Sequence, residues 1–252
     1  NTMKKVKSCG VTDYTLILDR GFFSQGNLEE LLGGDCSFII PATMVLKDVK
    51  TLMSVTQRDI EDPRYLKKFN KNPIFVKPVT LTLQNLKIDG YCYYDQKREQ
   101  NEKETFYTGL YDVREKLQEV KIPKWRNPSD VFKERARSLA KYLTWKQVGD
   151  RFEIGTKKNA VTMRINGMGK SLIFYNGDYD WMDCLSLYRE RDIVERGFKS
   201  LKHDIESLPL NTNKDSTTRG FLFISFIGLI LRMRLVNRMK ETGLIKGYTL
   251  EK

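Results

Sequence analysis

The chain has 252 residues, of which 44 are Lys or Arg and 32 are Asp or Glu, so its formal net charge is +12. Hydrophobic residues make up 40% of the sequence, which is enough for a folded core and argues against a disordered chain. The basic surplus favours a polyanionic partner, nucleic acid first, and a basic protein without such a partner is an equal alternative.

The cysteine and histidine content limits which metal sites and catalytic sites the chain can form. The four cysteines have no CxxC spacing, and the chain holds a single histidine, His203. A zinc knuckle, a His-rich metal site and a Ser-His-Asp triad are therefore poorly supported. The scattered thiols are typical of a reducing cytoplasm, which is where we expect the protein.

Two segments bear on membranes. No apolar stretch follows the basic residues near the N-terminus, so no signal peptide is predicted. The longest uncharged apolar run, Gly220 to Leu231, has 12 residues, fewer than the roughly 18 that span a bilayer. We therefore expect no membrane partner, and we predict a buried core helix over Phe221 to Leu235 with arginines on its polar side.

The first part of the chain has a strand–helix–strand pattern. Residues Tyr14–Leu18 and Cys36–Ile40 are short apolar runs typical of strands buried on both faces. Between them, Ser24 is a candidate cap for a helix over Gln25–Leu32, which Gly33 ends. This order predicts two parallel strands joined by a helix.

The middle of the chain is less regular and holds most of the basic surplus. Five runs have the composition of strands, namely 73–83, 88–94, 152–154, 161–165 and 171–175. Three segments favour helices, namely 45–55, 111–120 and 129–142. Lys157, Lys158 and Arg164 lie between strand-like runs, which leaves both a DNA-facing hairpin and a solvated turn open.

The distribution of charge separates this middle segment from its neighbours. Residues 47–179 carry 27 basic and 17 acidic side chains, a net of +10. Residues 1–46 have a net charge of −1 and residues 180–252 a net charge of +3. A basic segment between two more nearly neutral ones indicates a separate surface or an insertion.

The most informative segment is Leu185–Leu208, which holds no proline and is long enough for about six helical turns. On a helical wheel of about 100° per residue, its apolar residues form one stripe. Beside that stripe, one face carries Tyr188, Arg191, Glu195, Lys199 and Lys202.

A charged stripe of this kind is usually a solvated face with ion pairs between successive turns. Glu195, however, is a lone carboxylate among basic residues, and it borders the apolar stripe. A second carboxylate, Asp19, follows the predicted strand Tyr14–Leu18, although an aspartate there also commonly caps a turn. Two carboxylates that face one another suit Mg²⁺, and two such ions about 4 Å apart can cleave a phosphodiester.

The spacing Tyr188-x2-Arg191-x3-Glu195-x6-Lys202 resembles the Y-x2-R-x3-E-x6-K signature of the DDE transposases of bacterial insertion sequences. The stretch Leu18–Phe23 resembles the strand end that carries the second catalytic aspartate in that family. The stretch 219–226 is similar to the helix that follows the signature there. The middle of the chain agrees with the family only in general layout.

This resemblance implies an α/β fold, with a ribonuclease H-like core and a β-rich or mixed insertion. In these terms, residues 1–46 are the first part of the core, 47–179 the basic insertion and return strand, and 180–252 the C-terminal helices. Asp19 and Glu195 are then the catalytic metal ligands. The implied cofactor is Mg²⁺ or Mn²⁺, with two ions in the complete enzyme.

The implied partner is double-stranded DNA, at the transposon ends and at the target, bound by a homodimer. The implied DNA-binding residues are those of the stripe, namely Tyr188, Arg191, Lys199 and Lys202. The implied reaction is hydrolytic nicking at the end of the element, followed by attack of the freed 3′-hydroxyl on target DNA.

One departure from the family pattern concerns the first of its three catalytic carboxylates, which precedes the second by several elements. Only 18 residues precede Asp19, and Asp13 is too close to be that ligand. We therefore expect a chain that lacks the N-terminal part of the family fold and that alone has little or no catalytic activity. A DNA-binding remnant without catalysis and a ribonuclease H-like nuclease are the alternative functions.

Overall fold

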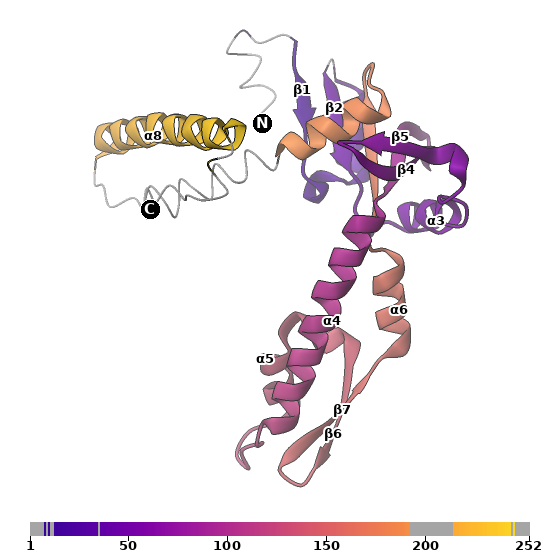
Figure 1. Ribbon diagram of the computed structural model, residues 1–252, viewed down its shortest axis with the longest axis vertical. Coiled ribbons are helices and arrows are strands. Elements are labelled where there is room, and N and C mark those ends of the chain that lie inside the picture. The colour runs from indigo at the N-terminus through magenta and orange to yellow at the C-terminus, as the bar shows by residue number, and fades with distance from the viewer. Residues whose placement is uncertain are drawn as a thin grey trace. The chain divides into compact units, whose positions relative to one another are not determined.

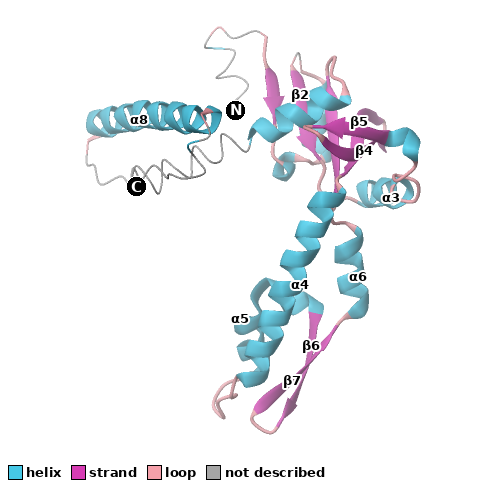
Figure 2. Cartoon of the chain, viewed as in Figure 1, coloured by secondary structure: helices cyan, strands magenta, loops and turns pink. Residues whose placement is uncertain are grey.

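The computed structural model describes residues 13–34, 36–191 and 214–242, together with Ser8, Gly10 and Leu244. The chain divides into two compact units, Asn1–Trp181 and Met182–Lys252. Helices and strands are mixed along the first unit (Figures 1 and 2), so the α/β class predicted from the sequence is confirmed.

A mixed sheet of six strands organises the first unit, in the order β1-β2-β8-β5-β4-β3. β1 and β2 run parallel, and every other neighbouring pair is antiparallel. The strands are β1 (Thr15–Ile17), β2 (Ser37–Pro41), β3 (Leu66–Phe69), β4 (Asn72–Leu83), β5 (Leu86–Tyr94) and β8 (Lys170–Asn176). Four strands from the segment 47–179 thus share one sheet with β1 and β2.

The predicted strand–helix–strand unit is confirmed by β1, α2 (Gln25–Leu32) and β2. Ser24 caps α2, because its hydroxyl accepts a hydrogen bond from the backbone N–H of Asn27 at 3.4 Å. Gly33 is the C-cap residue of the same helix. The parallel register pairs Leu16 with Phe38.

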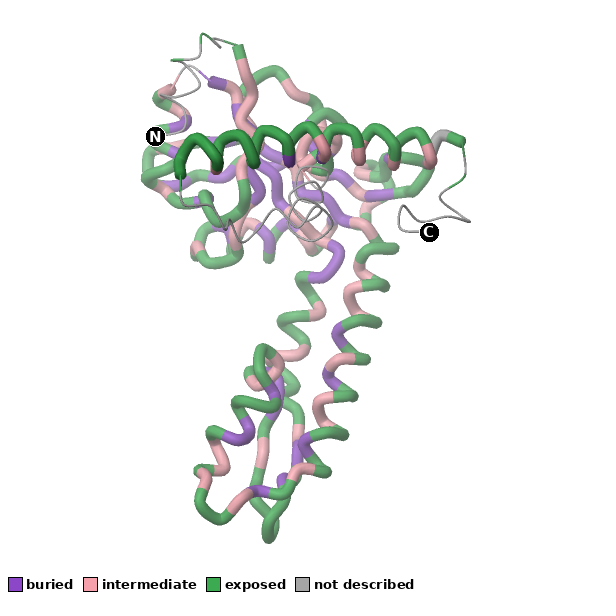
Figure 3. The backbone as a smooth tube through the Cα atoms, turned by 90° about the vertical axis from the view of Figure 1, so that its left-hand side faces the viewer, coloured by how far each residue is buried: buried purple, intermediate pink, exposed green. Residues whose placement is uncertain are grey.

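The larger hydrophobic core lies on one face of this sheet. Figure 3 shows the buried residues along the chain in purple. Alternate residues of each strand face it, as the two-residue period of a strand requires. Phe38 and Phe174 contribute fully buried rings, and α3 (Lys47–Thr56) adds Val49 and Met53 to the same core. The 3₁₀ turn η1 (Arg20–Phe22) lies between β1 and α2, and η2 (Pro63–Tyr65) lies between α3 and β3.

Between β5 and β8 the chain forms a lobe, residues 96–169, which has its own hydrophobic core. Its elements are α4 (Gln96–Glu119), α5 (Pro128–Ala136), η3 (Arg137–Tyr142), β6 (Leu143–Val148), β7 (Arg151–Thr156) and α6 (Lys158–Asn166). β6 and β7 pair as an antiparallel hairpin. Phe106, Leu110 and Leu117 follow one face of α4 and pack into the lobe core.

One prediction about this lobe is wrong, and one of two alternatives left open for it is excluded. Residues 161–165 belong to α6 rather than to a strand. Val161 and Ile165 are four residues apart and pack against the lobe core, whereas Met163 remains exposed, so the helical period outweighs the β-branched composition. Lys158 therefore begins a helix and does not lie in a DNA-facing hairpin.

The helix predicted over 111–120 is the second half of the longer α4. The charged stretch before it is helical because Asp95 caps the helix by accepting a hydrogen bond from the Arg98 N–H at 3.0 Å. Ion pairs from Arg98 to Glu102 and from Lys103 to Glu99 then join successive turns. The helix predicted over 129–142 ends as α5 at Ala136, and its remainder is η3.

Residues 181–191 are helical and all but Trp181 belong to the second unit, in which α8 spans Asp215–Glu241. Helix 181–191 begins four residues before the predicted start at Leu185, and Cys184 and Leu185 are buried. Residues 192–213 lie outside the described part of the chain.

The prediction of a buried core helix over Phe221 to Leu235 is wrong for most of its side chains. Phe223 is 67% exposed and Ile224 is 72% exposed, while Leu229 is buried. The helix carries its own apolar residues on every face. Burial of one face therefore leaves the apolar residues of the other faces exposed to solvent. By length and composition alone, α8 over Asp215–Met239 could cross a membrane.

Candidate functional site

Asp19 lies two residues beyond Ile17, the last residue of β1. The backbone N–H of Leu18 still donates to the carbonyl of Ile39 at 2.9 Å, and the chain then turns into η1. The Asp19 carboxylate accepts a hydrogen bond from the backbone N–H of Arg20 at 2.6 Å, so it caps that turn. Asp19 is exposed at the edge of the sheet where the parallel strands β1 and β2 both end.

The residues around Asp19 fix this position. Leu18 packs against the sheet core on one side of the turn, and Phe23 is 3% exposed on the other. The ring of Phe23 lies 5.5 Å from that of Phe174 in β8. Because apolar anchors precede and follow the turn, the polar residues between them are directed to the surface.

A second aspartate, Asp95, follows β5 at the same edge of the sheet. The pairing of Tyr94 with Lys170 and of Ile173 with Pro41 places the end of β5 beside the end of β2. Three strand spacings separate β5 from β1, which is about 14 Å. Asp95 is thus too far from Asp19 to share a metal ion.

Helix 181–191 carries the first two residues of the predicted stripe. The guanidinium carbon of Arg191 lies 5.2 Å from the centre of the Tyr188 ring, so the two side chains share one helix face as the spacing predicts. Glu195, Lys199 and Lys202 lie outside the described residues. Within the described part of the chain, no group of three or more His, Cys, Asp and Glu side chains is arranged to hold a metal.

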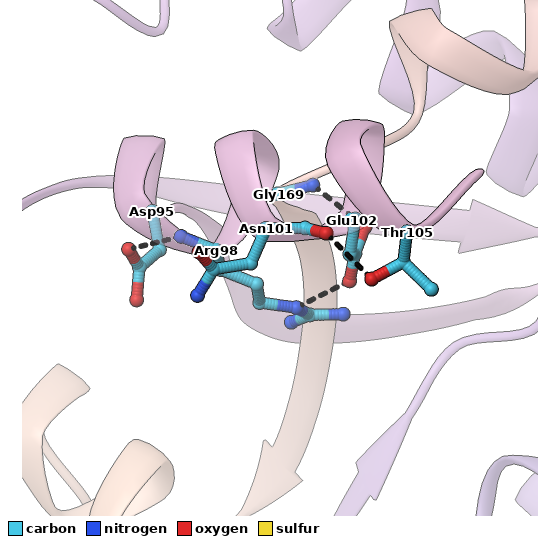
Figure 4. A network of polar contacts seen from close by, with 6 residues as sticks. All are labelled: Asp95, Arg98, Asn101, Glu102, Thr105 and Gly169. Atoms are coloured by element: carbon cyan, nitrogen blue, oxygen red, sulfur yellow. Dashed lines mark hydrogen bonds and ion pairs between the residues drawn. The ribbon is translucent and has the colours of Figure 1, made fainter. Parts of the chain in front are cut away.

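A polar network joins the lobe to the sheet (Figure 4). Asp95 N–H donates to the Gly169 carbonyl at 2.9 Å, and Gly169 N–H donates to the Glu102 carboxylate at 3.0 Å. The other oxygen of Glu102 accepts from Nε of Arg98 at 2.7 Å. The first turns of α4 are thereby held to the residue that precedes β8.

Glu99 extends this network on the neighbouring side of α4. Burial alone would raise the pKa of Glu99, but hydrogen bonds from Lys103 and Tyr94 outweigh burial and hold that pKa below its ordinary value. Burial and the hydrogen bond to Glu99 raise the pKa of Tyr94. Lys170 lies over the Tyr94 ring at 4.5 Å and adds positive charge at this point.

The lobe carries much of the basic charge of the protein. Residues 96–169 hold 17 basic and ten acidic side chains, a net of +7. A cleft of about 690 Å³ next to the polar network has both signs of charge in its lining, including Arg98, Arg164 and Glu102. A groove of about 750 Å³ on another face of α4 has Arg114 and Lys158 in its lining and no carboxylate.

Sequence reasoning did not single out this second groove. Its clearest signal is the spacing of Tyr107, Tyr111 and Arg114, which places them on one helix face. That signal is hidden when the predicted helix begins only at Tyr111.

No family model, no curated protein and no solved structure matches this chain.

Proposed function

We propose that this chain acts on DNA as part of a DDE-type transposase with a ribonuclease H-like core, in which Asp19 and Glu195 hold the catalytic metal. The observation that carries the proposal is the position of Asp19, two residues after the end of β1 and at the edge where β1 and β2 both end. Polar side chains at the carboxyl ends of parallel strands commonly form the binding site of an α/β protein.

The donor set suits a hard divalent cation. A carboxylate has about four lone-pair positions, so a carboxylate that accepts a hydrogen bond, as Asp19 does from Arg20, can also bind a metal. Asp19 and Glu195 would hold Mg²⁺ or Mn²⁺, together with oxygens of the DNA phosphate. When bound, the metal supplies the charge that activates a water and stabilises the leaving oxygen.

The basic stripe would position the DNA. Tyr188 and Arg191 share one helix face, and Arg191 can donate two parallel hydrogen bonds to a phosphate. Lys199 and Lys202 are the further phosphate contacts of the proposal. The protein would act in the cytoplasm as a homodimer on paired DNA ends, and the buried free thiols of Cys36, Cys92 and Cys184 suit a reducing compartment.

The metal site is tested by titrating the full chain with Mn²⁺ and measuring the heat of binding. We expect Asp19→Asn and Glu195→Gln each to weaken Mn²⁺ binding at least about tenfold. The amide oxygen that Asp19→Asn introduces can still accept the hydrogen bond from Arg20, so the turn should fold normally. The matched controls are Asp13→Asn and Glu190→Gln, which should bind Mn²⁺ as the wild type does. Equal Mn²⁺ affinity in all five proteins would overturn the proposed site.

A second candidate function is DNA binding without catalysis. It is favoured by the basic lobe, which has its own core and shares no residue with the proposed metal site. The discriminating result is tight, salt-dependent binding of duplex DNA by a protein whose Mn²⁺ affinity is insensitive to both Asp19→Asn and Glu195→Gln.

A further inference from the structure

Helix α8 has one covered side and one exposed apolar side. Ser225 and Leu229 are four residues apart and only 5% and 8% exposed, so their side of the helix is covered within the chain itself. On the other side, four large apolar side chains are between 37% and 67% exposed, namely Phe223, Phe226, Ile227 and Ile230. All four lie within about 60° of Phe223 on a helical wheel, and we call them the α8 stripe. Contiguous exposed apolar residues of this kind mark an interaction surface.

Charged residues bound the α8 stripe at both ends of the same helix face. Arg219 precedes the stripe, and its guanidinium forms an ion pair with the Asp215 carboxylate at 2.9 Å. Arg234 follows the stripe, and Arg238 lies about one turn further on. One end of the face therefore carries a neutral Asp–Arg pair, and the other end carries two arginines.

These charges favour a protein partner over a lipid bilayer. Although α8 is long enough to cross a bilayer, its uncharged run has only the 12 residues 220–231. Such a run spans about 18 Å, whereas the hydrocarbon layer is about 30 Å thick. Insertion would draw Arg232 and Arg234 toward the apolar layer, where an arginine is costly. In a complex with another protein, both arginines can stay in water at the edge of the contact.

The α8 stripe is complementary to itself. Its midpoint lies between Phe226 and Ile227. A two-fold axis through that midpoint runs a second copy of α8 antiparallel to the first and sets Phe223 opposite Ile230. The same axis sets Phe226 opposite Ile227, so each aromatic ring meets an aliphatic side chain. One helix face can thus serve as both halves of a symmetric interface.

The distribution of charge selects the antiparallel orientation. In a parallel pair, Arg234 and Arg238 of both copies would meet at one end. In the antiparallel pair, these basic ends lie about 28 Å apart, which exceeds the screening length of about 8 Å at physiological salt. Arg238 of each copy then lies opposite Asp215 of the other copy. The antiparallel pair therefore avoids the repulsion and gains an attraction.

We propose that the α8 stripe binds the α8 stripe of a second copy of this chain, with the two helices antiparallel. The resulting dimer forms in the absence of DNA. It depends neither on the proposed metal site nor on the proposed DNA contacts, and it gives the four exposed side chains a buried environment.

The first test is sedimentation velocity of the full chain without DNA. We expect a monomer–dimer equilibrium with a dissociation constant in the micromolar range, as is usual for a small interface. Ile227→Glu should raise this constant at least about tenfold, because it buries a charge next to its own copy at the two-fold axis. The matched control is Leu235→Glu, the same change at a 51% exposed position outside the stripe, which should dimerise as the wild type does. Circular dichroism of each variant confirms that it is folded.

The second test establishes the orientation of the helices. Ser216 of one copy lies opposite Asn237 of the other in the antiparallel pair. A short bismaleimide should therefore link Ser216→Cys protein to Asn237→Cys protein in a mixture, and should link Ser216→Cys protein to itself much less. Wild-type protein treated in the same way gives the background from the natural cysteines, of which Cys36, Cys92 and Cys184 are buried.

Two variants separate this dimer from the proposed function. Asp19→Asn should dimerise as the wild type does, and Ile227→Glu should bind Mn²⁺ as the wild type does. Failure of the metal site and failure of the α8 dimer therefore give different results.

Four outcomes would overturn the proposal. The first is a wild-type chain that stays monomeric at about 100 μM, far above the expected dissociation constant. The second is equal dimerisation of folded Ile227→Glu and Leu235→Glu proteins. The third is flotation of the wild type, but not of Ile227→Glu, with phosphatidylglycerol vesicles, which would assign the stripe to a lipid surface. The fourth is a Ser216→Cys product linked to itself that exceeds the mixed product, which would show parallel helices.

Discussion

The carboxylate of Glu102, in α4, accepts a hydrogen bond from the backbone N–H of Gly169, the residue directly before β8, at 3.0 Å. The two residues are 67 positions apart in the chain. This contact joins the beginning of the lobe to its end. It exists because Gly169 approaches α4 closely, in a backbone conformation with φ of +69° that other residues rarely adopt.

Replacement of Gly169 by alanine should therefore destabilise the protein. A Cβ at this position would lie 2.6 Å from Cβ of Glu99 and 2.7 Å from the carbonyl oxygen of Asp95. Because these close contacts add to the strain of the positive φ, we expect Gly169→Ala to lower the free energy of unfolding by about 1–3 kcal/mol, measured by urea denaturation. Gly167→Ala is the control, because its Cβ would meet only Arg164, at an ordinary 3.8 Å. Equal stability of both variants would contradict this account.

Arg191→Ala should weaken the binding of duplex DNA at every sequence. If Arg191 contacts a phosphate, its loss should lower affinity and reduce the slope of log K against log salt by about one. Anisotropy titrations at several salt concentrations measure both quantities. Arg189→Ala removes the same charge from a different face of helix 181–191 and should change the slope less. An unchanged slope in Arg191→Ala would argue against a phosphate contact.

Cys92 should be inert in the folded protein. It is fully buried in the sheet, and burial raises the pKa of its thiol to about 12. Because the thiolate is the reactive form, iodoacetamide at a pH of about 8 should leave Cys92 unmodified in the native state and alkylate it in guanidinium chloride. Mass spectrometry of the digested protein measures the modification at each cysteine. Rapid native alkylation at Cys92 would show that this part of the sheet opens readily.

Glu99 should contribute to acid sensitivity. Its pKa in the folded state is below the ordinary value, so its stabilising effect is fully present above the unfolded-state pKa of about 4.3 and is lost as pH falls through the lower folded-state value. Glu99→Gln should therefore show a shallower loss of stability over this acid range than the wild type. Glu104→Gln, an exposed residue on the same helix, should keep the wild-type pH profile. Urea denaturation at a series of pH values distinguishes the two.

The sequence predicted the elements whose local signals agree with one another. Apolar runs indicate β1 and β2, and the cap at Ser24 with the stop at Gly33 defines both ends of α2. The position of Asp19 at a strand end follows from the same pattern. These features depend on residues that are close together in the sequence, so they can be predicted from the sequence alone.

The remainder depends on contacts between distant residues. The β-branched run in α6 predicts a strand, because nothing local shows that Val161 and Ile165 pack into the lobe core. The first half of α4 is highly charged, and its helix rests on the cap at Asp95 and on ion pairs between turns. The spacing of Tyr107, Tyr111 and Arg114 indicates that they share one helix face, but the buried state of the Arg114 Nε atom, which has no hydrogen-bond partner among the described residues, depends on three-dimensional surroundings that no residue pattern displays.

The ends of the lobe meet on neighbouring strands, since Tyr94 pairs directly with Lys170 across β5 and β8. Two antiparallel strands in this register can be joined by a turn of about two residues. The sheet could therefore close as a plain hairpin with residues 95–169 replaced by such a turn, and all six strands would keep their order. The lobe could therefore be gained, lost or replaced by a single recombination at a hairpin turn. The sheet that carries Asp19 would remain unchanged.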